Sequence, residues 1–296
     1  MNILLSGSTG LIGSHLTHVL IRDGYSVTAL VRSKNRKDAT YWNFEKKEIE
    51  REKLEGFDCV IHLAGESIAE GSWTTEKKAR IRYSRVRGTE FLCKTLSELS
   101  SPPKLIMCAS ATGYYGNRGT EIVSEDSSAG NGFLARICYD WEKATEEAKN
   151  IRVVNLRFGM ILTPLGGALK KMVLPFRMGL GGVLGSGEQY MSCISLDDAL
   201  GAILHILRHD NLSGPINIVS PDPVTNRRFT KILSKVLKRP SLFPVPSFAL
   251  RLMFGEMADE LLLSGARVIP VKLNASGYEF RHKTLEDALR DMLVKY

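Results

Sequence analysis

The chain has 296 residues, of which 44% are hydrophobic and 24% charged, and its formal net charge is +8. This composition is typical of a globular protein, and the length suffices for one large domain or two smaller ones. No apolar run approaches the roughly 18 residues of a membrane-spanning helix, and the first residues lack the pattern of a secretory signal peptide. Five scattered cysteines without a CxxC pair argue against zinc and against a disulfide framework, so we expect a cytoplasmic protein without a metal site.

The positive charge is densest between Lys77 and Arg87, where six residues are Lys or Arg. At helical spacing Lys78, Arg82 and Arg85 share one face, which we interpret as a solvated helix surface. Neither an aromatic platform nor a known nucleic-acid motif accompanies these charges. We therefore expect a small-molecule substrate, and neither a nucleic acid nor a membrane as partner.

Strands and helices alternate along the first half of the chain. Strands that are apolar on both faces are predicted at residues 2–8, 25–31, 57–65, 103–110 and 152–159. Helices are predicted at residues 11–24, 75–99 and 132–149. This alternation predicts an α/β protein with a Rossmann-like, doubly wound parallel sheet covered by helices on both sides.

The second half has a different texture, with Gly- and Pro-rich loops between short helices. We expect residues 1–165 to form the Rossmann domain and residues 166–296 a smaller C-terminal lobe that binds the substrate. A late apolar stretch near residues 215–220 is expected to rejoin the sheet of the first domain.

Three glycines at intervals of three separate the first strand from the first helix, in the sequence LLSGSTGLIGSHL. Glycine lets the backbone turn tightly and approach a pyrophosphate, and the helix N-terminus offers free N–H groups to that anion. The placement of this GxxGxxG motif between a strand and a helix predicts a dinucleotide site. The loop residues assigned to the cofactor are Gly7, Thr9, Gly10, Leu11, Ile12 and Gly13.

The end of the second strand indicates which dinucleotide is bound. Sites that prefer NAD usually carry an acidic residue there, whereas this chain has Arg32, Lys34, Arg36 and Lys37 before its first acid, Asp38. An arginine is suited to a 2′-phosphate, and a charge-assisted hydrogen bond contributes about 1.5–3 kcal/mol. The sequence therefore predicts NADP as the cofactor, with Arg32 as the residue that selects it.

Several motifs resemble those of the extended short-chain dehydrogenase/reductase superfamily: the glycine loop, HLAGE at 62–66 and SATGYYG at 110–116. Later stretches, among them CYDWEKA, LRFGMILTPLGGAL and PVPSFALRLMFGEMADELLLSGARVIP, resemble its nucleoside-diphosphate-sugar epimerase subgroup with a C-terminal domain of unknown function. The resemblance extends from residue 1 to about residue 293. The further cofactor contacts that we assign are Leu63, Ala64, Gly65, Glu66, Arg85 and Ile161.

The resemblance also implies a catalytic set. Superfamily enzymes use a Ser or Thr at a strand end together with Tyr-xxx-Lys on a helix, where the lysine lowers the pKa of the tyrosine. The matching residues are Ser110, with Thr112 as the alternative, and the pair Tyr139 and Lys143. Such a tyrosine moves a proton while hydride passes to or from the nicotinamide.

A helical wheel leaves the role of Tyr139 and Lys143 open. They point nearly opposite the apolar stripe of their helix, whereas Cys138 and Glu142 lie closer to its edge. The apolar stripe comprises Leu134, Ile137, Trp141 and Ala148. If Tyr139 is not catalytic, the alternative proton-transfer groups are Tyr114, Tyr115 and Glu66.

Two functions fit these observations. The first is an NADP-dependent oxidoreductase or epimerase of the extended short-chain dehydrogenase type, which acts on a small substrate such as a nucleotide sugar. The second is a non-catalytic NADP-binding redox sensor or scaffold. A homodimer is compatible with both functions. The two functions differ in whether a proton donor lies within hydrogen-bond reach of the reacting atom.

Overall fold

The computed structural model describes residues 1–34, 36 and 38–294, which form two compact units. The first unit comprises Met1–Ser110, Ile137–Leu156 and Arg208–Pro215. The second unit comprises Ala111–Arg136, Arg157–Leu207 and Ile216–Tyr296. Both units are discontinuous in the sequence, and a domain division at residue 165 stays a prediction. Among the described residues, no helix is both long and apolar enough to cross a membrane.

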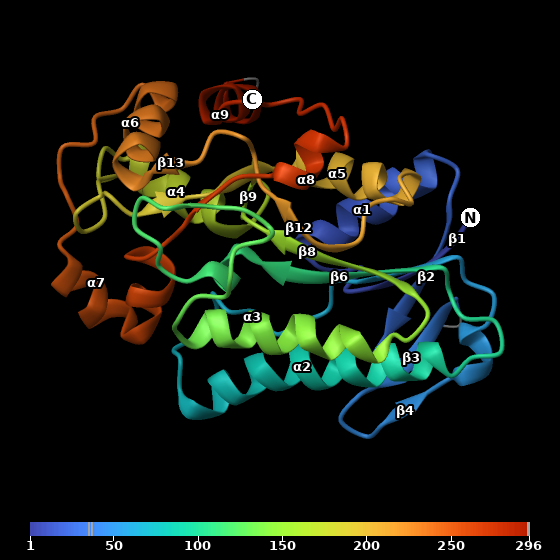
Figure 1. Ribbon diagram of the computed structural model, residues 1–296. Helices are drawn as coiled ribbons and strands as arrows, with labels where there is room; N and C mark the ends of the chain where they lie inside the picture. The colour runs from blue at the N-terminus through green and yellow to red at the C-terminus, as the bar shows by residue number, and fades with distance from the viewer. Residues whose placement is uncertain (35, 37, 295–296) are drawn as a thin grey trace. The chain divides into compact units, whose positions relative to one another are not determined.

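An eight-stranded sheet has the order β12-β8-β6-β5-β1-β2-β3-β4 (Figure 1). Its strands are β1 (Asn2–Ser6), β2 (Ser26–Val31), β3 (Ala39–Asn43), β4 (Glu48–Ile49), β5 (Cys59–His62), β6 (Leu105–Ala111), β8 (Arg152–Phe158) and β12 (Gly214–Ile218). β1 pairs in parallel with β2 and with β5, and the parallel pairing continues to β3 and to β6, while β4 is antiparallel to β3. This order confirms the predicted α/β fold with a mostly parallel, Rossmann-like sheet. The chain winds outward from β1 in both directions, so β1 lies at the position where such folds bind ligands.

The α-helices of the first unit are α1 (Leu11–Arg22), α2 (Thr75–Ser97) and α3 (Phe133–Ala144, of which Phe133–Arg136 belong to the second unit). Figure 1 shows α1 on one face of the sheet and α2 beside α3 on the other. α2 begins at an N-cap, Thr74, whose side chain accepts a hydrogen bond from the Lys77 N–H. The buried indole N–H of Trp141 in α3 donates to Thr89 Oγ1 in α2 at 2.8 Å, which holds these two helices together.

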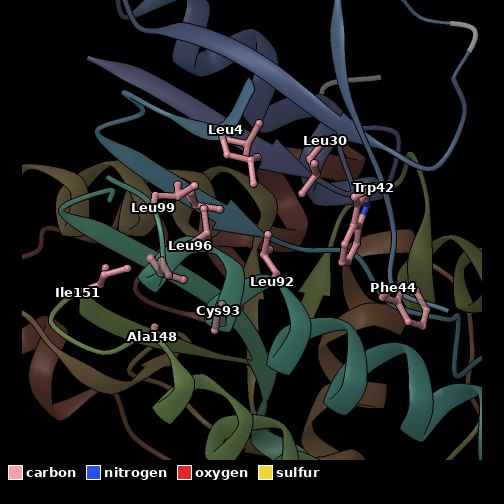
Figure 2. Packing of buried hydrophobic residues seen from close by; sticks show 14 residues of the cluster. Leu4, Leu30, Trp42, Phe44, Leu92, Cys93, Leu96, Leu99, Ala148 and Ile151 are labelled. Carbon is pink, nitrogen blue, oxygen red and sulfur yellow. The ribbon is translucent and has the colours of Figure 1, made fainter. Parts of the chain in front are cut away.

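One core cluster of the first unit lies between the sheet and α2 (Figure 2). Leu4 and Leu30 come from β1 and β2, and Leu92 and Leu96 from α2; each is at most 2% exposed. Trp42 of β3 closes one side of this cluster. Complete burial of a leucine side chain contributes about 1.5–3 kcal/mol, so this contact is a main reason why α2 folds onto the sheet.

The described part of the second unit contains six helices of the α type, several short strands, the 3-10 helix Thr112–Tyr115 and the π-helix Ala258–Leu262. The helices are α4 (Gly167–Arg177), α5 (Leu196–Arg208, of which Arg208 belongs to the first unit), α6 (Asn226–Leu237), α7 (Ser247–Phe254), α8 (Val271–Ala275) and α9 (Leu285–Leu293). The strands are β7 (Ile122–Val123), β9 (Met160–Leu162), β10 (Tyr190–Met191), β11 (Cys193–Ser195), β13 (Val224–Thr225) and β14 (Arg267–Val268). One apolar cluster of this unit joins Leu169 of α4, Phe229 of α6 and Leu289 of α9.

Candidate functional site

The glycine loop follows β1 and leads into α1, as expected. Gly7 has a φ of +71°, and a Cβ at this position would lie 2.8 Å from the carbonyl carbon of Leu63. A Cβ on Gly13 would lie 2.2 Å from the Gly7 carbonyl oxygen. The loop can therefore take this shape only with glycine at both positions, because a β-carbon would displace backbone atoms.

Gly10 has a different role, since it is the N-cap of α1 and provides no side-chain capping hydrogen bond. Its φ of −75° and ψ of 173° are allowed for any residue, and a Cβ there would meet only the Gly7 carbonyl oxygen, at 3.3 Å. The first N–H groups of α1 thus have no side-chain cap, and the positive end of the helix dipole is available to an anion. Thr9 is exposed, and Leu11 and Ile12 are half-buried beside it.

The segment Leu63–Glu66 after β5 lies against the end of β1. Ala64 N–H donates to Ser6 Oγ at 3.3 Å, and Ser6 Oγ is 2.6 Å from His62 Nδ1. His62 is fully buried, and burial lowers its pKa to about 4, so its ring is neutral at neutral pH. Ser6 Oγ therefore links the His62 ring to the Ala64 N–H, and these two hydrogen bonds hold the 63–66 segment beside the end of β1.

The basic end of β2 was predicted to bind a 2′-phosphate. Arg32 is exposed directly after the strand. Lys34 Nζ lies 3.7 Å from Glu48 and 4.6 Å from the Tyr41 ring centroid, and Arg36 pairs with Asp38 at 3.4 Å. Lys37 lies outside the described residues. Arg32 acts on Glu66, since its positive charge helps to lower the pKa of that carboxyl.

Glu66 is itself held by α2. Lys77 Nζ donates to Glu66 Oε1 at 2.7 Å, and Arg80 Nε lies 3.7 Å from the same oxygen. The hydrogen bond from Lys77 is the main reason why the pKa of Glu66 is lowered, with Arg80 and Arg32 adding to it. Glu66 is therefore a carboxylate at neutral pH, and its role as an alternative proton-transfer group stays a prediction.

Arg85 of α2 contacts the backbone of the 63–66 segment. Its Nη1 donates to the Glu66 carbonyl at 2.9 Å, and its guanidinium carbon lies 5.0 Å from the Trp141 ring centroid. A Cβ on Gly65 would approach this guanidinium carbon to 3.4 Å, so a larger residue at position 65 would crowd the arginine. Burial lowers the pKa of Arg85, yet the group stays charged because its ordinary pKa is far above neutrality. Arg85 thus positions the 63–66 segment and holds a cation beside α3.

The strand-terminal serine has a carboxylate partner. Ser110, 3% exposed at the end of β6, donates through Oγ to Glu142 Oε1 of α3 at 2.6 Å. On the same helix Cys138 is buried, whereas Tyr139 is 46% exposed and Lys143 is exposed as well. The predicted orientation of this helix is confirmed, and the residue it brings to Ser110 is Glu142 and not Tyr139. A hydrogen bond of this length to a carboxylate is charge-assisted and belongs to the stronger class of protein hydrogen bonds.

The remaining assigned residues lie in the second unit. Tyr115 is fully buried, donates to Asn217 Oδ1 at 2.7 Å and accepts from Arg157 Nη1 at 2.9 Å. Burial raises the pKa of Tyr115 to about 12, which disfavours its use as a base, and the Arg157 guanidinium stacks 3.6 Å from the Tyr114 ring centroid. Both tyrosines thus contact Arg157, and a proton-transfer role for either of them stays a prediction. Ile161 lies in β9, paired in parallel with β11.

A second polar cluster surrounds His282 in this unit. Its Nδ1 lies 3.1 Å from Ser195 Oγ and 3.2 Å from Asp198 Oδ2, and its Nε2 lies 3.2 Å from Asp291. Ser195 donates its hydroxyl proton to Asp198 at 2.6 Å and accepts the Asp198 N–H at 3.0 Å. A serine that caps a helix and donates to a carboxylate is not an activated nucleophile. Within the described ranges, no group of three or more His, Cys, Asp or Glu could hold a metal ion.

Comparisons with known proteins agree with this geometry. Residues 3–219 match the model of the NAD dependent epimerase/dehydratase family, and residues 245–292 match a domain of unknown function, DUF1731. The chain is 42% identical over 290 residues to an epimerase family protein of Mycobacterium bovis, covering 97% of this chain and 96% of that protein. It is 38% identical to the epimerase family protein YfhF of Bacillus subtilis, covering 99% and 98%.

Solved structures show the same similarity. The human epimerase family protein SDR39U1 (isoform 2) with NADPH has a TM-score of 0.91 and 31% identity, and all of both chains is covered. A nucleoside-diphosphate sugar epimerase from Corynebacterium glutamicum has a TM-score of 0.82 and 32% identity, covering 99% of this chain and 58% of that one. UDP-glucose 4-epimerase from Thermotoga maritima, at 21% identity and a TM-score of 0.77, shares the fold.

Proposed function

Because this chain belongs to the NAD-dependent epimerase/dehydratase family, we propose that it is an NADP(H)-dependent oxidoreductase or epimerase of the extended short-chain dehydrogenase type. The observation that carries the proposal is the glycine loop: Gly7 and Gly13 permit its tight turn, and Gly10 as the N-cap leaves the N-terminus of α1 without a side-chain cap. The similarity to a human protein solved with NADPH supports the choice of cofactor.

The described residues fit a dinucleotide. The N–H groups at the start of α1 would bind the pyrophosphate, and exposed Arg32 would bind the 2′-phosphate. The 63–66 segment would border the cofactor, with Arg85 fixing its backbone. When bound, NADP(H) supplies or accepts the hydride. The contact assigned to Ile161 remains part of this proposal.

The proton chemistry is assigned to Ser110 and Glu142. The Ser110 hydroxyl would donate a hydrogen bond to the reacting oxygen of the substrate, and Glu142 would hold or return the proton through its 2.6 Å contact with Ser110 Oγ. The earlier assignment to Tyr139 and Lys143 is replaced in this proposal, because both side chains are exposed while Glu142 contacts the serine.

The substrate class that we propose is a small molecule linked to a nucleotide, such as a nucleotide sugar. The proposed compartment is the cytoplasm, and the proposed function is compatible with a homodimer. Turnover tests the proposal: the protein loaded with NADP(H) is incubated with nucleotide sugars and small carbonyl compounds, and products and NADPH oxidation are followed. Tight NADPH binding without any turnover across such a panel would favour the alternative function, a non-catalytic NADP-binding sensor or scaffold.

A further inference from the structure

One surface of the second unit combines positive charge with exposed apolar side chains. Residues 165–185 and 238–254 each contain three Lys or Arg, six in total, and no Asp or Glu. The two segments lie side by side, because Val245 exchanges backbone hydrogen bonds with Val183 and Gly185 at 2.8 and 2.9 Å. Arg239 Nε also donates to the Arg177 carbonyl oxygen at 3.1 Å. We call residues 165–185 and 238–254 the apolar–basic surface.

Exposed apolar side chains are concentrated on this surface. In the described part of the chain, twelve large apolar side chains are more than half exposed, and nine of these belong to the two segments. They are Leu165, Leu174, Met178, Leu180, Leu242, Phe243, Phe248, Leu252 and Met253. Single exposed apolar residues are common in soluble proteins, whereas nine of them in two segments that are hydrogen-bonded to each other favour an interaction site.

Helix α7 shows how the fold holds these side chains outward. Leu250 is its one buried residue, while Phe248 and Leu252, one turn apart, are 71% and 86% exposed. Arg251 Nη2 pairs with Asp259 Oδ1 at 2.9 Å, which fixes the helix to the following turn. The apolar face is therefore presented by a folded helix and does not depend on a rearrangement.

The positive charge of the apolar–basic surface indicates which of three partners it binds: a second copy of the chain, a nucleic acid or a lipid bilayer. Arg251 is paired with Asp259, so the other five basic residues carry the charge of the surface. A second copy that presented the same surface would bring these residues against one another, which disfavours a symmetric dimer through this face. Nucleic acid would satisfy the charge and leave the leucines and phenylalanines in water. A bilayer that contains anionic lipids satisfies both features, because basic side chains attract the headgroups while apolar side chains enter the acyl boundary.

We propose that the apolar–basic surface docks the protein peripherally on an anionic lipid bilayer. This proposal replaces the expectation from the sequence that the protein has no membrane partner, and it does not depend on the proposed enzyme activity. The contact is superficial: α7 and the end of α4 lie in the membrane interface, with Phe248 and Leu252 as anchors.

Vesicle co-sedimentation of the full chain tests the proposal. The probes are phosphatidylcholine vesicles with and without an equal part of phosphatidylglycerol, at low and at high salt. We expect binding to the anionic vesicles, at least tenfold weaker binding to neutral ones, and weakening by salt, since salt screens exposed charges. The double variant Phe248→Ser/Leu252→Ser should bind at least tenfold more weakly. Ile21→Ser removes a comparably exposed side chain (56%) from the first unit and should bind like the wild type.

Three results would overturn the proposal. The first is a wild-type protein that sediments with neither vesicle, and the second is a double variant that binds like Ile21→Ser. The third is a wild-type dimer in analytical ultracentrifugation that the double variant abolishes, because the surface then serves a second copy. Thermal melts of all variants show that they are folded, and little change is expected because the replaced side chains are exposed.

Discussion

Replacement of Gly10 by valine separates cofactor binding from folding. The extended backbone at Gly10 accepts valine, and the added Cβ meets only the Gly7 carbonyl oxygen, at 3.3 Å. Loss of a glycine N-cap should therefore cost about 1 kcal/mol of stability, seen as a fall of a few degrees in Tm. The isopropyl group, however, would stand over the first N–H groups of α1. Loss of two charge-assisted hydrogen bonds amounts to about 3 kcal/mol or more, which is roughly a 150-fold increase in the Kd for NADPH.

Gly13→Ala is the matched comparison for this variant. Its Cβ would lie 2.2 Å from the Gly7 carbonyl oxygen, so the loop must shift at a cost of about 1–3 kcal/mol, and both Tm and NADPH affinity should fall. The two variants are compared by calorimetric titration with NADPH and by thermal melts. If Gly10→Val binds NADPH with wild-type affinity, the N-terminus of α1 does not hold the pyrophosphate and the loop is merely a turn.

The remaining predictions concern the proton relay and a buried histidine. Ser110→Ala and Glu142→Gln should each lower kcat by about 10²–10⁴-fold in the turnover assay, whereas Tyr139→Phe should change kcat less than about twofold. If all three variants lose kcat equally, Tyr139 takes part in proton transfer and the assignment to Ser110 and Glu142 is wrong. The pKa of His62 is about 4 in the folded protein and 6.5 in the unfolded chain. Between these two pH values the unfolded chain therefore binds more protons than the folded protein. Stability should thus be full above pH 6.5 and decrease by about 3 kcal/mol as the pH falls to 4. Denaturant titrations of His62→Asn should show a flatter pH dependence over this window, and an unchanged slope would contradict the assigned burial effect.

The parts of the fold that depend on local patterns could be predicted from the sequence. The apolar strands, the glycine loop and the long helix α2 all have periodicities or turn residues that act over a few positions. β3 and β4 were not predicted, because the segment 39–49 mixes aromatic, polar and charged residues and gains its strand conformation by pairing at the sheet edge. The helix predicted at residues 132–149 ends at Ala144 and continues as a short 3-10 turn, Thr145–Glu147.

The candidate site could be predicted only in part, for a related reason. Apolar periodicity fixed the direction in which α3 faces, and it placed Glu142 nearer the buried side than Tyr139. The partner of Glu142 is 32 residues away, and no local pattern indicates that Ser110 would be that partner. The same holds for Tyr115 and Asn217, which are 102 residues apart and form a buried hydrogen bond. Contacts of this kind depend on how strands and loops pack together, and a motif match carries no information on that packing.

We propose above all that the chain binds NADP(H) and selects it through the 2′-phosphate. Calorimetric titration of the wild-type protein and of Arg32→Ala with NADPH and with NADH tests this claim directly. We predict that the wild type binds NADPH about 10- to 100-fold more tightly than NADH, as expected for one charge-assisted hydrogen bond of about 1.5–3 kcal/mol. Arg32→Ala should lose most of that preference while its affinity for NADH stays the same. Equal affinities of the wild type for the two cofactors, or an unchanged preference in Arg32→Ala, would contradict the account.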